Sequence, residues 1–117
     1  MDVRGLYESL GVNFDDVLAL LRKEERIKLY LVQTMDDPSF ADLSAAMASG
    51  DYEVAFRAAH TIKGMAANLM LKPLLDNAVP LVECLRGGQP DPAEALRLYE
   101  ALEANRCEVA QLVKALA

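Results

Sequence analysis

Apolar residues recur at intervals of three or four positions through most of the 117-residue chain, which is the spacing of one face of an α-helix. No segment alternates apolar and polar residues with an enrichment in β-branched types, as a half-buried strand would. The chain is therefore predicted to be all-α. Because the helical segments are long and their connections short, we expect an antiparallel up-down four-helix bundle with a short extra helix at the N-terminus.

Proline, glycine and Asx residues indicate where these helices begin and end. A short N-terminal helix precedes Gly11, and Asn13 is the expected N-cap of the segment that follows. Pro80 removes one backbone hydrogen bond inside a later helix, so that helix is expected to kink or to begin late. The remaining helices are predicted over residues 24–35, from Asp37-Pro38 to Gly50, over residues 52–69, from Lys72-Pro73 to Gly87-Gly88, and from Asp91-Pro92 to the end of the chain.

The composition sets the class of protein and of partner. The chain is 53 % hydrophobic and 26 % charged, which allows one domain over residues 1–117 to bury a core without disulfide or metal support. Twelve basic and 18 acidic side chains give a net charge of −6, which disfavours nucleic acid and anionic membranes as ligands and favours protein partners. No apolar run approaches the ~18 residues of a membrane span and no signal-peptide pattern is present, so the cytoplasm is the predicted location.

The two cysteines, Cys84 and Cys107, lie far apart in segments predicted to be helical. Neither has the CxxC spacing or the nearby histidine that a zinc site or a redox pair would need. Both are predicted to be buried, reduced thiols, which behave as small apolar side chains.

The only histidine, His60, lies in the helix predicted over residues 52–69. At about 100° per residue, the core-facing positions of this helix share one direction to within about 40°. Measured from that direction, His60 points about 140° away and Gly64 about 180° away. The imidazole is therefore expected to face solvent. The core-facing stripe consists of Ala55, Ala59, Ile62, Ala66 and Leu69.

Small residues and one cation surround this histidine. A glycine at an exposed mid-helix position such as Gly64 costs about 1 kcal/mol relative to alanine, so its presence requires a compensating benefit. With Ala67 also adding little bulk, a partner could approach the imidazole closely. Lys63 brings an ammonium group near the ring, which suits the oxygens of a phosphoryl group. Taken singly, Lys63 and His60 are ordinary solvated side chains, but together these residues indicate a phosphoryl-handling site.

The segment AHTIKGMAANLM resembles the HxxKG motif of histidine-containing phosphotransfer (HPt) domains, with His60, Lys63 and Gly64 at the matching positions. The preceding GDYEVAFRAAH and the following LVECLRGG are also similar to that family. The resemblance extends over about residues 14–117 and is sharpest over residues 50–88. It implies a four-helix bundle that exposes the histidine in the middle of one helix.

By this resemblance the protein is a phosphocarrier and not an enzyme, because HPt domains have no ATP-binding kinase core. His60 would accept a phosphoryl group from the aspartyl phosphate of a receiver domain and pass it to another response regulator receiver. Lys63 would stabilise the phosphoryl oxygens and Gly64 would give steric access. We expect no cofactor and no metal on this chain, with Mg²⁺ on the partner receiver domain.

The expected partners are response regulator receiver domains, a hybrid sensor histidine kinase, or both, and the protein is expected to be a monomer. The chain is equally compatible with a free-standing carrier and with a piece of a hybrid kinase. Phe56, Arg57 and Ala67 are the predicted partner-binding residues around His60, although Phe56 alone is more typical of a bundle edge. Glu83 could orient the imidazole, but an exposed acidic side chain is the favoured interpretation.

Two residues depart from the family's pattern. Met65 follows the glycine where serine or alanine is frequent, and its direction of about −80° predicts packing on a neighbouring helix, away from the imidazole. Met70 stands where a glycine often ends the histidine helix. That helix end therefore lacks the usual left-handed residue, and its boundary is the least defined of those predicted.

Three other functions remain as alternatives. The chain could be an adaptor bundle that docks receiver domains without phosphotransfer, but an adaptor has no evident use for the intact His60, Lys63 and Gly64. A hydrolytic or acid–base enzyme would need an orienting carboxylate and a concave pocket. A structural bundle subunit would present large apolar residues outward, whereas only 6 % of the residues are aromatic and none is tryptophan.

Overall fold

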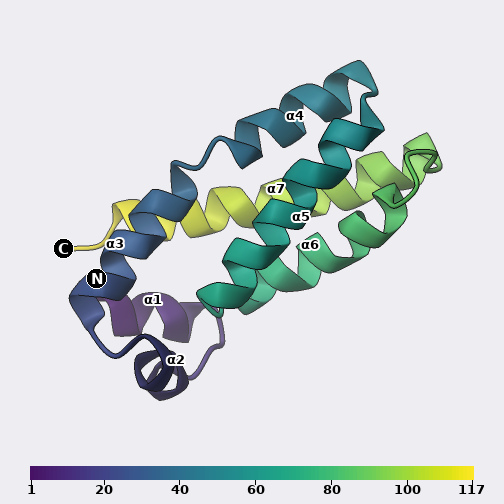
Figure 1. The fold of residues 1–117 in the computed structure, drawn as a ribbon. Coiled ribbons are helices and arrows are strands. Elements are labelled where there is room, and N and C mark those ends of the chain that lie inside the picture. The colour runs from purple at the N-terminus through teal and green to yellow at the C-terminus, as the bar shows by residue number, and fades with distance from the viewer.

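Seven helices and no strand make up the fold (Figure 1), and the computed structural model describes all 117 residues. The all-α prediction is confirmed. In chain order the helices are α1 (Val3–Ser9), α2 (Phe14–Leu21), α3 (Glu24–Met35), α4 (Ser39–Ser49), α5 (Tyr52–Asn68), α6 (Lys72–Leu85) and α7 (Pro92–Lys114).

Helices α4 to α7 lie side by side as the bundle (Figure 1). Helix α5 packs against both α4 and α6, and α6 packs against α7. Short turns join these helices, so that consecutive helices run in opposite directions. Helix α3 leads into α4 and contacts α7, while the two short helices α1 and α2 pack against α3 at one end of the molecule. None of the helices has the length and apolar character needed to cross a membrane.

The core-facing stripe of α5 is the one that helical periodicity predicts. Ala55, Ala59, Ile62 and Ala66 have no exposed surface, and Leu69 retains only 4 %. Most of these side chains are small, so α5 can approach α4 and α6 closely. The face of α5 opposite the stripe is thereby turned to solvent.

Most predicted helix boundaries agree with the capping geometry. Asn13 accepts a hydrogen bond from the Asp15 amide at 2.9 Å, and Gly50 ends α4 in the left-handed conformation with φ 75°. The start of α4 moves by one residue: the Asp37 carboxylate accepts from the Ser39 amide at 2.9 Å, so α4 begins at Ser39 and Pro38 takes the N-cap position. Helix α5 ends one residue earlier than predicted, at Asn68, and α7 ends at Lys114.

Pro80 does not delay the start of its helix, because α6 is continuous from Lys72 to Leu85. Proline cannot donate to the carbonyl of Asp76 one turn earlier. Both residues are exposed, so water can solvate that carbonyl and no buried acceptor is left unpaired.

The end of α5 is well defined, with Met70 itself in the left-handed conformation at φ 53°. The Leu71 amide donates to the Ala66 carbonyl at 2.9 Å and the Met70 amide to the Ala67 carbonyl at 3.2 Å. These two bonds form a Schellman motif, which normally uses glycine at the position of Met70. Leu71 is fully buried, and this burial helps to offset the cost of a left-handed methionine.

The N-terminal helix α1 supports the same turn. The Tyr7 hydroxyl donates to the carbonyl of Leu69 at 2.7 Å, and the tyrosine has no exposed surface. Leu69 is the C-cap of α5, so its carbonyl has no partner within the helix. Tyr7 therefore ties the end of the histidine-bearing helix to a segment more than 60 residues earlier in the chain.

The prediction that both cysteines are buried is wrong for Cys107 and only partly right for Cys84. Cys84 is half-buried, whereas Cys107 is exposed, and both are free thiols. The inward positions of α7 are Ala95, Leu102, Asn105 and Val109, and Cys107 lies on the outer face of that helix.

Tyr7→Phe should lower the free energy of unfolding by about 1–2 kcal/mol, because it leaves the buried Leu69 carbonyl without a donor. Urea titration measures the change. The control is Tyr30→Phe, because Tyr30 is 38 % exposed. Loss of its hydroxyl should change the free energy of unfolding by no more than about 0.5 kcal/mol. Equal losses in the two variants would contradict the assigned role of the Tyr7 hydroxyl.

Stability should also fall in alkali. Burial raises the pKa of the Tyr7 phenol, so the folded chain keeps this proton where the unfolded chain, with a tyrosine pKa of about 10, releases it. This contribution is present below about pH 10 and is lost as the pH rises above it. Urea titrations across this range should show a shallower decline for Tyr7→Phe than for the wild type, and identical slopes would contradict the expectation.

Candidate functional site

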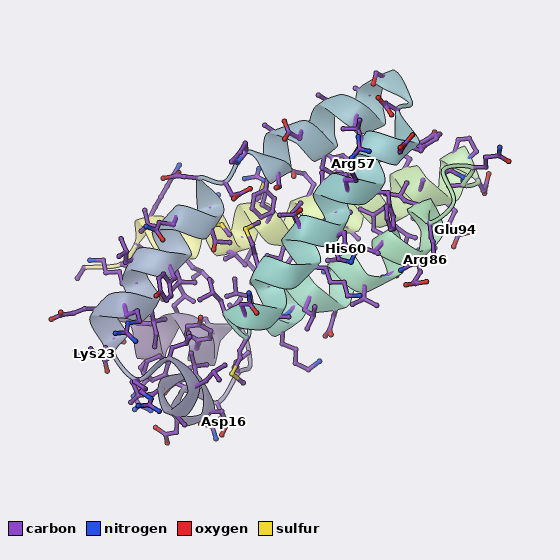
Figure 2. All side chains as sticks on the ribbon, in the orientation of Figure 1. Asp16, Lys23, Arg57, His60, Arg86 and Glu94 are labelled. Carbon is purple, nitrogen blue, oxygen red and sulfur yellow. The ribbon has the colours of Figure 1, made fainter.

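His60 lies near the middle of α5, on the face turned away from the bundle (Figure 2). Its side chain is exposed, while Ala59 and Ile62 beside it in the sequence are fully buried. The prediction that the imidazole faces solvent is confirmed. No protein group forms a hydrogen bond with either ring nitrogen, so a nitrogen lone pair is available to an incoming group.

The helix surface next to the imidazole is open. Gly64 and Ala67 are exposed, and a Cβ placed on Gly64 would meet no atom within 4 Å. The absent side chain at Gly64 is therefore not required by packing within the chain. Lys63 is half-buried and forms no ion pair, so its ammonium group remains available for an anion near His60.

The other side of His60 carries an aromatic ring and an arginine. The Phe56 ring centroid lies 6.0 Å from that of His60, with the planes inclined by 52°. The guanidinium carbon of Arg86, which follows α6, lies 5.3 Å from the Phe56 centroid, which is within the range of a cation–π contact. Phe56, His60 and Arg86 line one open depression together with Arg57 and Thr61.

Arg86 is bound to Glu83 by two hydrogen bonds. Its Nη2 donates to Oε1 at 2.9 Å and its Nε to Oε2 at 3.2 Å. The hydrogen bond and charge of Arg86 hold the pKa of the Glu83 carboxyl below its ordinary value, with a smaller contribution from Lys63. Glu83 is exposed and does not bind the imidazole, so the interpretation of Glu83 as an exposed acidic residue is confirmed.

Arg57 and Arg86 flank the histidine on opposite sides, toward α4 and on the α6 side respectively (Figure 2). The Arg57 side chain pairs with Glu53 at 3.2 Å, and the backbone carbonyl of Arg57 accepts a hydrogen bond from the Thr61 hydroxyl at 3.1 Å. The predicted residues Phe56 and Arg57 therefore both lie beside His60. Arg86 is absent from the sequence-based prediction, although its spacing of three from Glu83 was a visible signal of an ion pair.

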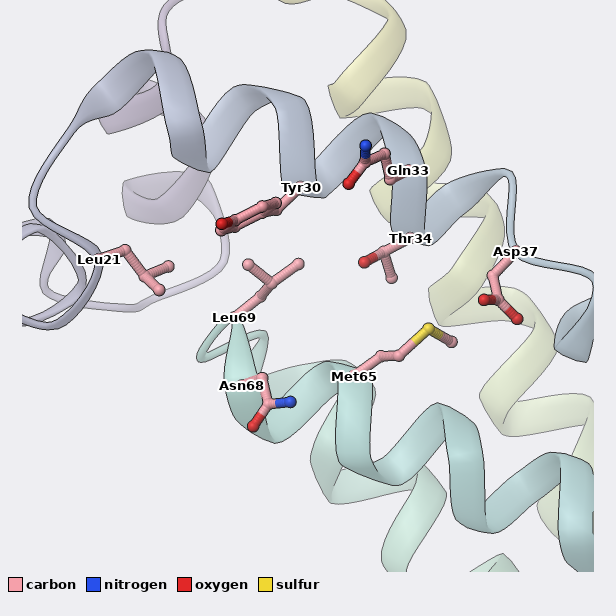
Figure 3. Close-up of a pocket in the computed structure, with 8 residues that line it drawn as sticks. All are labelled: Leu21, Tyr30, Gln33, Thr34, Asp37, Met65, Asn68 and Leu69. Atoms are coloured by element: carbon pink, nitrogen blue, oxygen red, sulfur yellow. The ribbon is translucent and has the colours of Figure 1, made fainter.

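A separate hollow of about 290 Å³ lies on the far flank of α5 (Figure 3). Met65 reaches into it toward Thr34 of α3, with Asn68 and Tyr30 also on its walls. Met65 is half-buried against the core and faces α3 across this hollow, which His60 does not line, so its predicted direction away from the imidazole is confirmed.

The carboxylates nearest to His60 form no metal site. No group of three or more histidine, cysteine, aspartate or glutamate side chains anywhere in the chain is arranged to hold a metal ion. Glu53 and Glu83 are each engaged by an arginine. That the chain works without a cofactor of its own stays a prediction.

The model of the Hpt domain family matches residues 27–117. Since this match spans most of the chain, the protein belongs to the Hpt domain family and takes part in the phosphorelays of two-component signalling. An Hpt domain is a phosphotransfer unit without a kinase core. Neither the comparison with curated proteins nor that with solved structures gave a match. Helices α1 and α2 lie outside the matched residues.

Gly64→Ala should raise the free energy of unfolding by about 0.5–1 kcal/mol, because alanine is the better helix former and its Cβ has open space. Urea titration checks this. The matched control is Gly5→Ala in α1, where the new Cβ would lie 3.2 Å from the capping carboxylate of Asp2. Gly5→Ala should raise the free energy of unfolding by less than Gly64→Ala does. A loss of stability in Gly64→Ala would show that Gly64 is required by packing.

Proposed function

We propose that the protein is a phosphorelay carrier. His60 accepts a phosphoryl group from the aspartyl phosphate of one receiver domain and gives it to the aspartate of another. The observation that carries this proposal is an exposed imidazole, free of protein hydrogen bonds, at the middle of a helix whose other face is fully buried. Membership of the Hpt domain family supports it.

In the accepting step, the lone pair of one imidazole nitrogen forms a bond to phosphorus. The bond from phosphorus to the aspartyl oxygen breaks, and the aspartate leaves as a carboxylate. The attacking nitrogen must be unprotonated, so the ring proton is held by the other nitrogen. Donation is the same displacement in reverse, with the carboxylate of the second receiver as the nucleophile and the imidazole as the leaving group.

The neighbouring residues serve this transfer in different ways. The ammonium group of Lys63 stabilises the equatorial oxygens, where the charge of the transferring group resides. Gly64 and Ala67 let the receiver approach the ring, and Phe56 and Arg57 contact the docked receiver. One chain contains the whole site, so the carrier acts as a monomer with receiver domains or a hybrid sensor histidine kinase as its partners.

Receiver chemistry requires a divalent cation, and we assign Mg²⁺ to the receiver's own site. The carboxylates beside His60 are already paired with Arg57 and Arg86, and hard cations need several oxygen ligands. The carrier then needs no cofactor.

The test is to incubate the protein with a panel of phosphorylated receiver domains and Mg²⁺. The wild type should acquire a label that is stable to alkali and labile to acid, as expected of a phosphorus–nitrogen bond, and His60→Gln should acquire none. Label on His60→Gln would show that another residue is the phosphoacceptor. Receivers that bind without transferring would instead support an adaptor, and a failure of every receiver to bind would remove both functions.

The same transfer assay distinguishes the role of Gly64 in receiver access from the role of Lys63 in stabilising the phosphoryl charge. Lys63→Ala should slow transfer by about tenfold through lost stabilisation of the phosphoryl oxygens, whereas Lys63→Arg should retain most of the rate. Gly64→Ala should also slow transfer, even though the variant is more stable. Transfer by Gly64→Ala at the wild-type rate would contradict the proposed role of Gly64 in receiver access.

A further inference from the structure

Arg86 is the one cation at the site that reaches it from a different part of the chain. Its guanidinium group lies over the Phe56 ring, and Phe56 adjoins His60. These two separations limit the distance from the guanidinium carbon to the imidazole centroid to about 11 Å. Arg86 and His60 also line the same open depression, in which the Phe56 ring lies next to both of them. A phosphoryl group on a ring nitrogen that faces this depression would extend into it, toward Arg86.

The present partner of Arg86 is one that an anion could displace. Both members of the Glu83–Arg86 pair are more than half exposed, and exposed ion pairs on protein surfaces are weak. A phosphoryl group carries about 1.5 to 2 negative charges near neutral pH and three acceptor oxygens. The planar fork of arginine, which now holds a carboxylate through two bonds, fits phosphate oxygens equally well.

We infer that Arg86 exchanges Glu83 for the phosphoryl group when His60 is phosphorylated. Glu83 thus acts as the resting counter-ion of Arg86 and competes with the phosphoryl group for it. Lys63 and Arg86 then hold the phosphoryl oxygens from α5 and from the end of α6. The Glu83–Arg86 pair thereby tunes how strongly the carrier retains the phosphoryl group before donation.

This inference deepens the proposed function and rests on it for its role in a relay. It is tested without any receiver, because phosphoramidate phosphorylates imidazole directly: the ring nitrogen bonds to phosphorus, the phosphorus–nitrogen bond of the reagent breaks, and ammonia leaves. The chain contains one histidine, so the phosphohistidine signals in a ³¹P spectrum come from His60. Failure of receivers to transfer would overturn the proposed function alone.

The measurement is the second pKa of the phosphoryl group, followed by ³¹P NMR on the charged protein. A nearby guanidinium favours the dianion and lowers this pKa. Arg86→Gln should raise it by about half a unit relative to the wild type, and Glu83→Gln, which releases Arg86, should lower it. In the wild type, the ¹⁵Nε resonance of Arg86 should move on phosphorylation.

The matched control is Arg97→Gln on α7. Arg97 is likewise exposed and paired with a glutamate three residues earlier, at 3.7 Å, but it lies outside the depression. This variant changes the net charge by the same amount and should leave the phosphoryl pKa unchanged. Equal shifts in Arg86→Gln and Arg97→Gln, or no decrease in Glu83→Gln, would overturn the inference.

Discussion

Burial of a single stripe of α5 determines what every other residue of that helix can do. Ala55, Ala59, Ile62 and Ala66 are fully enclosed by the bundle, so the rotation of α5 about its own axis is fixed. That rotation carries His60 outward, because its direction differs from the stripe by more than a right angle. The stripe, together with the Schellman motif that Tyr7 supports at the helix end, makes the histidine a rigidly mounted but accessible group. Under the proposed function, this combination lets one histidine meet both a donor and an acceptor receiver.

The charge around His60 depends on which basic side chains are bound in ion pairs, and not on the net charge of the chain. The chain as a whole is acidic, yet the surroundings of His60 contain Arg57, Lys63 and Arg86. Both arginines are held by glutamates and only Lys63 is free. The resting site therefore presents one unpaired cation, while further positive charge is available to an anion strong enough to displace a carboxylate. A transferring phosphoryl group has this property.

The sequence alone predicts much of the fold, because the dominant signals act within one helix. Helical periodicity predicts the buried stripe and the exposure of His60, and capping chemistry predicts Asn13 and Gly50. The contact of Arg86 with Phe56 depends on how α6 lies against α5, which no local pattern specifies. The left-handed Met70 is missed for a related reason, since the burial of Leu71 and the hydrogen bond from Tyr7 come from tertiary packing. Cys107 is predicted to be buried from the general tendency of cysteine, but its position on the outer face of α7 leaves it exposed.

The most direct test of the account is an NMR correlation between phosphorus and the imidazole nitrogens of ¹⁵N-labelled protein mixed with a phosphorylated receiver and Mg²⁺. The account predicts that one ring nitrogen of His60 becomes coupled to phosphorus, and that the coupling disappears when an unphosphorylated second receiver is added. Phosphorus found on any other residue, or an uncoupled His60 in the presence of a receiver that binds, would contradict it.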